Sequence, residues 1–565
     1  MAEVSAREYD YVIIGGGTAG LVLASRLTED PAINVAIIEA GEKNFDDPQI
    51  NIPGLMNTLY GDKKYDWDFH TTPQKYLNNR VLAWPRGRIL GGSSAINFLM
   101  HTHASRLDLD NWEALGNPGW NFESLQLYYH KSETYNAPSS ETAKALQTST
   151  IDPSLHGSKG PIQTSFPEGS GPVDHAWGPT CANIGLGVKQ DPRHGATLGG
   201  YSLLTEMDRN ARRSHAASAY YVPIAGRSNL IVLTNAHANR ICFSSSGTSA
   251  TATGVDYSIL ELSGIGSREI LEKYGVNFIV ENLNVGENLQ ASLDHLLVPF
   301  SYEAAEGIPT AEMIQEPGVL EWALREWKEK GAGPLATGVT GTGFMPGIAK
   351  QLQLQKELLL NEGEADIQFN YGATGTSPSA GNDISKLFAH TDPGGYVTIV
   401  AVITHALSRG SIHIQSIDPK VPPTIDPRYL SHPVDLNLMT DGLLFTHRLA
   451  TTKPLADILK DNPLGQGKII QPGYKIPSAE GLTERSAADT VKASSASSFH
   501  PVGTCSMLPK DDGGVVDPNL KVYGVENLRI VDASIFPLNV RGNIASLVYA
   551  VAERAADLIK EGRKG

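Results

Sequence analysis

The sequence predicts an α/β fold that begins with a strand, a helix and a second strand. Residues 11–14 are a short run of β-branched and aromatic residues, and a glycine-rich turn separates them from an apolar run at 21–27. A second strand-like run covers 35–38. At the other end of the chain, 545–560 carries apolar residues at helical spacing, with Glu553 expected on the outward face. This order predicts a parallel βαβ unit closed by a C-terminal helix.

The turn after the first strand has the pattern G-x-G-x-x-G. Gly15 permits the tight turn, Gly17 lets the backbone approach a pyrophosphate, and Gly20 lets helix and strand pack closely. Glu39 ends the second strand, where a carboxylate would accept hydrogen bonds from an adenosine ribose and repel a 2′-phosphate, which disfavours NADP. The pattern predicts a dinucleotide site; the alternative is a purely structural βαβ turn.

A second glycine cluster lies between Pro85 and Asn97. It combines arginines, small residues and hydroxyls, so its backbone could press against a flat or phosphorylated ligand. As a pattern alone it fits a surface loop equally well. Beyond residue 50 the chain does not continue as alternating strands and helices, as an NAD domain should, so we expect a second kind of structure to share the chain.

Composition excludes several classes of protein. The chain has 565 residues, 41% of them hydrophobic, which excludes a disordered or fibrous protein. A net charge of −15 without a basic block argues against nucleic acid as a partner. The most apolar run, 396–407, is too short to cross a bilayer and predicts a buried strand.

Three cysteines and the N-terminus bear on location and metals. Cys181, Cys242 and Cys505 form no paired motif, so we expect ordinary thiols in a reducing compartment and no metal site. No apolar stretch precedes the first strand, which predicts no secretory signal and a cytoplasmic location. Elsewhere, 311–330 and 351–361 look helical, and we expect Trp322 and Trp327 to anchor the core.

Further blocks, in a fixed order, resemble the glucose-methanol-choline (GMC) family of FAD oxidoreductases along almost the whole chain. These blocks are Glu39-Ala40-Gly41, Pro85 to Asn97, Leu262-Ser263-Gly264-Ile265-Gly266, Val285-Gly286-Glu287-Asn288-Leu289, Ser408-Arg409-Gly410-Ser411, His500-Pro501-Val502-Gly503-Thr504, Val531-Asp532-Ala533-Ser534 and Gly542-Asn543. The chain looks closest to aryl-alcohol oxidase and choline dehydrogenase.

The resemblance implies an α/β fold, α+β overall, with a Rossmann-like FAD-binding domain and a substrate domain built on an antiparallel β-sheet. We expect the FAD-binding domain in 1–159, 211–295 and 495–565, the last part carrying the catalytic residues. The substrate domain is expected in 160–210 and 296–494.

The resemblance also implies FAD as the cofactor. Binding is expected to be noncovalent, because Ile96 stands where some members carry a histidine that bonds FAD. The residues implied to contact it are Gly15, Gly17, Thr18, Ala19, Gly20, Glu39, Ala40, Arg88, Gly91, Gly92, Ser93, Asn97, Ala238, Asp532, Ala533 and Asn543.

Alcohol oxidation removes a hydride and a hydroxyl proton. The flavin accepts the hydride, so a base is needed for the proton, and a neutral histidine suits this role. His500 heads the block that resembles the family's catalytic segment, and Asn543 stands at its partner position. An asparagine there would orient the hydroxyl and stabilise the developing alkoxide.

These residues predict oxidation of a primary, aromatic or partly apolar alcohol to the aldehyde, with oxygen or another electron acceptor. We expect the reaction to serve fungal secondary metabolism. One alternative is a lyase with structural FAD, because some relatives cleave hydroxynitriles with the same histidine; another is a degenerate, inactive member.

The chain departs from the family's pattern at three places. Between Val255 and Ser263 it lacks strands and a small-residue turn that the resemblance predicts, which suggests that part of the flavin domain is absent. His101 and His103 replace an aromatic residue and an arginine, and either alter the access channel or are packing substitutions. Three extra residues, 291–293, lengthen the block that follows Leu289.

Overall fold

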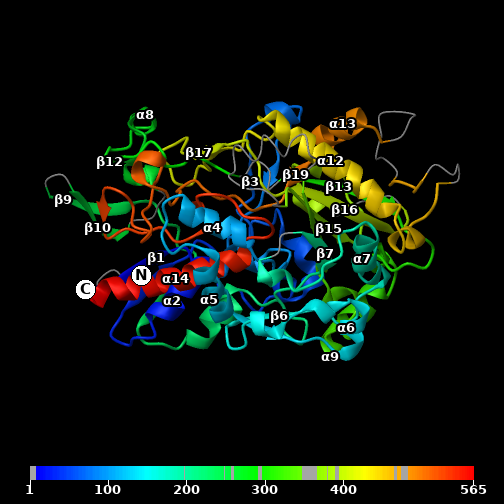
Figure 1. Cartoon of the computed structure of the whole chain (residues 1–565). Helices are drawn as coiled ribbons and strands as arrows, with labels where there is room; N and C mark the ends of the chain where they lie inside the picture. Colours follow the sequence, from blue (N-terminus) through cyan, green and yellow to red (C-terminus); the bar gives the residue numbers. More distant parts are fainter. Residues whose placement is uncertain are drawn as a thin grey trace.

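The structure is a computed structural model, and it describes residues 8–195, 198–246, 249–255, 260–290, 296–346, 365–377, 380–387, 393–462, 467–471 and 482–564. Two regions lie side by side (Figure 1). One is built around a small parallel sheet and the C-terminal helix, the other around a large antiparallel sheet. The predicted α/β class with an antiparallel second sheet is confirmed.

The parallel sheet has the strand order β1-β2-β8. These strands are β1 (Tyr11–Ile14), β2 (Val35–Ile38) and β8 (Leu230–Leu233). Helix α2 (Thr18–Leu27) connects β1 to β2 and buries its apolar side chains in the same core as helix α14 (Ala545–Lys564). The predicted βαβ unit is therefore present, with β1 at the edge of its sheet among the described residues.

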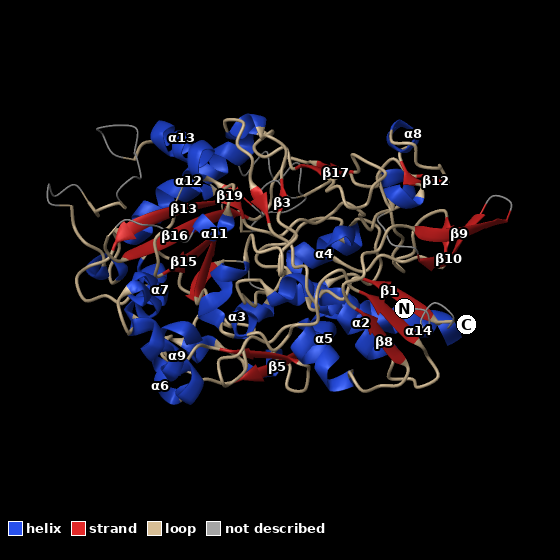
Figure 2. Cartoon of the chain, turned by 180° about the vertical axis from the view of Figure 1, so that it is seen from behind, coloured by secondary structure: helices blue, strands red, loops and turns tan. Residues whose placement is uncertain are grey.

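A second small sheet belongs to the same region. It joins β20 (Val525–Glu526), β10 (Ser249–Val255) and β9 (Ile241–Ser246). In both views β1 lies between this sheet and α14 (Figures 1 and 2). The segments that border the βαβ unit thus come from two distant parts of the chain, 241–255 and 525–564.

The large sheet has the order β19-β13-β16-β15-β14-β7. Its strands are β19 (Ala496–Ser497), β13 (Leu296–Glu303), β16 (Tyr396–Ile403), β15 (Ile367–Gly372), β14 (Gly341–Met345) and β7 (Gly199–Ser202). All its pairings are antiparallel. The run predicted as a buried strand forms β16, and helix α12 (Pro433–Ala450) packs on it.

Shorter elements surround these sheets. The remaining helices are α3 (Pro48–Asn51), α4 (Arg106–Ala114), α5 (Phe122–Ser132), α6 (Ser140–Ala145), α7 (Pro172–Asn183), α8 (Arg268–Lys273), α9 (Val319–Lys330), α11 (Ile384–Leu387) and α13 (Glu484–Ser494). The remaining strands are β3 (Phe69–His70), β4 (Ala83–Trp84), β5 (Glu133–Asn136), β6 (Ile162–Ser165), β11 (Ile265–Gly266), β12 (Val280–Glu281), β17 (Ser411–His413) and β18 (Thr424–Asp426). No described helix is long and apolar enough to span a membrane.

Two side chains differ from the sequence-based expectation. Trp322 is 43% exposed, because α9 buries only one narrow face around Ala323, whereas the indole of Trp327 donates to the Ala211 carbonyl at 2.8 Å. Glu553, expected outward, is fully buried. Helix α14 is covered on this flank as well, and the guanidinium of Arg26 on α2 binds both Glu553 oxygens, at 2.7 and 2.8 Å. The predicted helix at 351–361 lies outside the described residues.

Candidate active site

A cavity of about 1920 Å³ connects the glycine turn to the C-terminal segment. Every residue that the sequence assigned to the cofactor or to catalysis lines it, except Gly91. Gly91 lies directly beneath the lining, where its N–H donates to the Gly16 carbonyl at 2.7 Å. The second glycine cluster is therefore part of the site rather than a surface loop.

The two glycine clusters touch each other through their backbones. A Cβ on Gly92 would lie 2.7 Å from the Gly17 Cα, and Gly92 has a φ of +54°. A Cβ on Gly20 would lie 2.0 Å from the Gly15 carbonyl oxygen. Together the two glycine clusters form a cradle of backbone atoms. The N-terminus of α2 opens into this cradle, and its N-cap residue, Gly17, has no side chain to cap the helix. Free N–H groups at a helix N-terminus suit a pyrophosphate, so the cradle fits a dinucleotide.

Glu39 lies at the end of β2, beside the cradle. Its carboxylate accepts hydrogen bonds from the N–H groups of Gly16 and Gly41, at 2.8 and 2.7 Å. Burial raises the pKa of this carboxyl, while the two backbone hydrogen bonds lower it. Glu39 thus stabilises the glycine turn through these hydrogen bonds and also lines the cavity.

His500 and Asn543 meet at the other end of the cavity. The Asn543 Nδ2 lies 3.2 Å from the His500 Nε2. The Asn543 backbone is clamped by Thr102, whose hydroxyl accepts from its N–H at 2.6 Å and donates to its carbonyl at 2.9 Å. Gln368, on β15, donates to the Asn543 Oδ1 at 3.4 Å. Segments far apart in sequence therefore hold one histidine against one amide.

Three aromatic rings line the cavity beside His500. The ring of Phe499 stacks on Tyr60 at 5.8 Å and on Phe98 at 6.0 Å. Phe499 has a φ of +77°, a conformation that costs a non-glycine residue about 1–2 kcal/mol. The Arg86 guanidinium donates to the Phe499 carbonyl at 3.0 Å and so helps to hold this turn. The strained turn leads directly into His500.

Asn97, at the end of the second cluster, is fixed from behind by a buried arginine. The Arg213 guanidinium donates to the Asn97 side-chain oxygen at 2.6 Å and to its carbonyl at 2.7 Å. Sequence reasoning missed Arg213, Thr102 and Gln368, because no local pattern marks residues that contact the site only after folding. Arg86 lay inside the recognised cluster but was given no role.

His101 and His103 do not line the cavity. The His101 ring lies 3.3 Å from a Glu206 carboxylate oxygen, and the His103 ring stacks on Tyr129 at 3.9 Å. Burial lowers the pKa of His103 well below its ordinary value, so this ring stays neutral. Of the two alternatives left open by the sequence, packing substitution is the one that the structure supports.

The cavity also follows β1 along Tyr9 to Ile14. Among the described residues no strand pairs with this edge of the sheet, and the side chains of Val12 and Ile14 are 39% and 41% exposed. The sequence predicts missing strands between Val255 and Ser263. Residues 256–259 and 291–295, at the two departures, lie outside the described residues.

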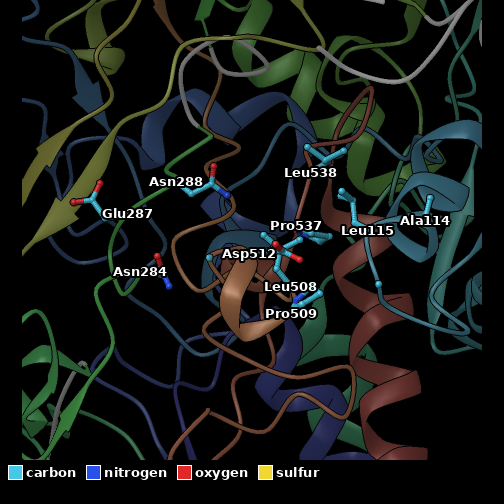
Figure 3. Close-up of a pocket in the computed structure, with 12 residues that line it drawn as sticks. Ala114, Leu115, Asn284, Glu287, Asn288, Leu508, Pro509, Asp512, Pro537 and Leu538 are labelled. Carbon is cyan, nitrogen blue, oxygen red and sulfur yellow. The ribbon is translucent and has the colours of Figure 1, made fainter. Parts of the chain in front are cut away.

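A second cavity of about 590 Å³ lies elsewhere (Figure 3). Figure 3 shows Leu115 and Leu538 on one side and Glu287 and Asn288 on the other. Two of its polar side chains have partners: Glu287 lies 2.9 Å from the His413 ring, and Asn288 donates to the Ser506 hydroxyl at 2.8 Å. None of the predicted site residues lines it.

Comparison with known proteins identifies the family. Residues 9–261 and 406–552 match two GMC oxidoreductase profiles. The GMC oxidoreductase family protein Mala s 12 of Malassezia sympodialis is 34% identical over 622 aligned positions, covering 99% of this chain and 93% of the relative. Mitochondrial choline dehydrogenase of Homo sapiens is 31% identical, covering 98% and 90%. Since 622 positions exceed 565 residues, the Malassezia protein carries residues that this chain lacks.

Solved structures agree. An FAD-dependent oxidoreductase from Chaetomium thermophilum superposes with a TM-score of 0.83 at 27% identity, covering 99% of this chain and 100% of the other. A fungal aryl-alcohol oxidase gives 0.79 at 25% identity, with coverage of 99% and 100%. The matches span both regions of the fold and both ends of the cavity. The chain is an oxidoreductase that belongs to the GMC family.

Proposed function

We propose that this protein oxidises a primary, aromatic or partly apolar alcohol to the aldehyde, with noncovalently bound FAD and with His500 as the base. The observation that carries the proposal is the contact of 3.2 Å between His500 and Asn543 in a cavity that begins at a dinucleotide cradle. Bound FAD would supply the hydride acceptor. Ile96 lines the cavity and offers no nucleophile for a covalent bond to the cofactor.

The chain's own residues would bind and orient the cofactor. Gly17 and Gly92 leave room for a pyrophosphate, and the α2 N-terminus faces it. Glu39 would accept hydrogen bonds from the adenosine ribose, and Ala238 lines the same cavity. Asn97, Asp532 and Ala533 line this cavity together with His500.

The proton of the substrate hydroxyl would pass to the Nε2 of His500. Because the Asn543 amide N–H lies beside that nitrogen, one hydroxyl oxygen can reach both groups. On binding, the hydroxyl would replace the amide N–H at the imidazole lone pair. Its proton would then move to the imidazole while the amide donates to the oxygen as negative charge develops. Thr102 holds the amide's backbone in place during this transfer.

The walls of the cavity support an apolar or aromatic substrate. The rings of Tyr60, Phe98 and Phe499 contact one another beside His500, and Met100 adds a flexible apolar side chain. The Arg86 guanidinium, the charged group in this wall, donates to the carbonyls of Pro85 and Phe499. The likeness to a fungal aryl-alcohol oxidase supports the same substrate class.

Oxygen or another acceptor would reoxidise the flavin, and a cytoplasmic role in fungal secondary metabolism stays a prediction.

The test is a panel of benzylic, allylic and aliphatic alcohols, assayed with oxygen and with an artificial acceptor. We expect His500→Ala to keep the yellow colour of FAD and to lower turnover by about 10²-fold or more, because the base is lost. His175→Ala, at an exposed histidine, is the matched control and should behave as the parent. Near-normal turnover of His500→Ala would refute the assigned base.

The same experiment separates the alternatives. Under anaerobic mixing, a flavin that bleaches with an alcohol supports oxidation, whereas a flavin that never bleaches with any donor supports the lyase. Protein that purifies colourless and takes up no added FAD supports the inactive member, for which the edge of β1, unpaired among the described residues, is the structural reason.

A further inference from the structure

A chain of hydrogen bonds runs from the large sheet to the proposed base. It begins at the backbone carbonyl of Phe369 in β15, which accepts from the Thr342 hydroxyl at 3.2 Å. A carbonyl can only accept, so the single hydroxyl hydrogen of Thr342 is committed to it. The Thr342 oxygen is then left to accept. Thr342 is fully buried, so water does not compete for either role.

Gln368 supplies the next link. Its Nε2 donates to the Thr342 oxygen at 3.1 Å, and its side chain is almost fully buried. Because that oxygen needs a donor, the NH₂ group of the amide, and not its carbonyl, must face Thr342. The second Nε2 hydrogen is shared between two acceptors, the Asn370 Oδ1 at 3.2 Å and the Asn543 Oδ1 at 3.4 Å.

The polarity continues through Asn543. Because its Oδ1 accepts from Gln368, its Nδ2 is turned toward the His500 Nε2, 3.2 Å away. An amide N–H at this position requires an acceptor on the imidazole. In the neutral ring, this arrangement puts the lone pair on the His500 Nε2 and the proton on Nδ1. The Phe369 carbonyl in β15 thus sets the donor direction of each hydrogen bond between Thr342 and His500.

We propose that Gln368, supported by Thr342, is a positioning residue that holds the Asn543 amide with its N–H toward His500 and so keeps the base in its accepting form. The proposal rests on the proposed function. Gln368 comes from the large antiparallel sheet, whereas His500 and Asn543 come from the C-terminal segment. The relative placement of the two regions therefore prepares the base for proton transfer.

If Gln368 no longer donates to Asn543, the hydrogen bonding at His500 changes in a defined direction. A hydrogen bond donated to the neutral imidazole stabilises the neutral form and lowers its pKa. Without Gln368, the Asn543 amide can turn over and present its oxygen, which stabilises the protonated ring instead. The rise of kcat/KM with pH, which reports deprotonation of the base in the free enzyme, then moves to higher pH.

The experiment uses the full-length enzyme loaded with FAD. Gln368→Met keeps the length of the side chain and removes its donor. We expect kcat to fall by about tenfold, the pH profile of kcat/KM to shift to higher pH, and the FAD content to stay unchanged. Gln315→Met, at an exposed glutamine, is the surface control. An unchanged turnover and pH profile for Gln368→Met would overturn the proposal.

A matched pair at Thr342 covers the case in which Gln368→Met fails to fold. Thr342→Ser keeps the hydroxyl and should behave as the parent, while Thr342→Val keeps the volume and should shift the pH profile in the same direction as Gln368→Met. Equal profiles for Ser and Val would also overturn the proposal. His500→Ala runs in the same series: if it stays active, the proposed function fails, whereas loss of activity with normal Gln368 and Thr342 variants rejects only the positioning role.

A spectroscopic measurement needs no turnover. ¹⁵N-labelled histidine in the parent protein should show the His500 Nε2 at the chemical shift of an unprotonated ring nitrogen, assigned by its loss in His500→Ala. In Gln368→Met we expect this signal to move toward the protonated value at the same pH. A parent spectrum with a protonated Nε2 at neutral pH would contradict the inferred polarity.

Discussion

The two regions of the fold are built in different ways. In the region with the glycine turn, β1 is an edge strand of the three-stranded parallel sheet among the described residues, and Val12 and Ile14 remain 39% and 41% exposed. In the other region, the six-stranded antiparallel sheet buries seven of the eight residues of β13. The cradle in the first region depends on close contacts between glycine backbones, whereas the second region depends on packed side chains.

This difference explains which kind of substitution each region tolerates. A packed sheet holds its shape through many side-chain contacts, so the loss of one has a local cost. A glycine cradle has no side chain to remove, and a carbon added at Gly20 or Gly92 meets backbone. The comparison can therefore be tested by deletion of side-chain atoms in one region and by addition of one carbon in the other.

The largest expected effect comes from deletion in the large sheet. Ile399 in β16 is fully buried, so Ile399→Ala should lower the free energy of unfolding by about 2–5 kcal/mol. Val12→Ala, in the half-open β1, should change it by about 0.5 kcal/mol or less. Urea unfolding of both variants measures the difference. If the two substitutions cost the same, β1 is as well packed as β16 and the comparison fails.

A smaller loss of stability, with a specific loss of cofactor, is expected from Gly20→Ala. The new Cβ would lie 2.0 Å from the Gly15 carbonyl oxygen, so strand and helix must separate, at a cost of about 1–3 kcal/mol. The FAD-to-protein absorbance ratio should fall sharply. Gly226→Ala adds the same carbon where nothing lies within 4 Å and is the control. A Gly20→Ala protein with full FAD content would show that the cradle is not the cofactor site.

The smallest effect concerns pH and the junction of the two regions. Burial lowers the pKa of His413 in β17, but hydrogen bonds with Glu261 and Glu287 outweigh it and raise the pKa above its ordinary value. The group binds its proton more tightly in the folded state. Its contribution is complete below the unfolded pKa of about 6.5 and is lost as pH rises through the raised folded pKa.

His413→Gln should therefore be less stable than the parent at pH 6, by about 1 kcal/mol or less, with the gap closing as pH rises. Thermal unfolding of both proteins from pH 6 to pH 9 measures this gap. A difference that stays constant over the range would mean that the ion pairs with the two glutamates do not contribute.

Local sequence predicted the βαβ unit well. The strands at 11–14 and 35–38 have the predicted bounds, and the helix begins at Thr18, immediately after the turn. Such agreement is expected, because the strand periodicity and the glycine pattern act within a few residues of each other. The same local reasoning was wrong for Glu553 and Trp322, since helical spacing shows which residues share a face but not what packs against that face.

Other features required the fold. The contact between His500 and Asn543 was expected from the family resemblance, but Gln368 and Thr102 lie far from both in sequence, and no motif marks them. Arg213 likewise reaches Asn97 from a distant segment. Each of these contacts depends on how one sheet is placed against another, which is set by the sum of many packing contacts.

By itself, the sequence determined the chemistry that the protein can hold: glycines where backbones must touch, a carboxylate after β2, and one histidine in a recognisable C-terminal block. The tertiary structure alone decided how that histidine is held, which residues support it, and that β1 is an edge strand of the parallel sheet in the described part of the chain. The physical reason is the separation along the chain between the residues that determine each property. Backbone conformation follows from neighbours along the chain, whereas burial, hydrogen-bond direction and strand neighbours follow from residues that only folding brings together.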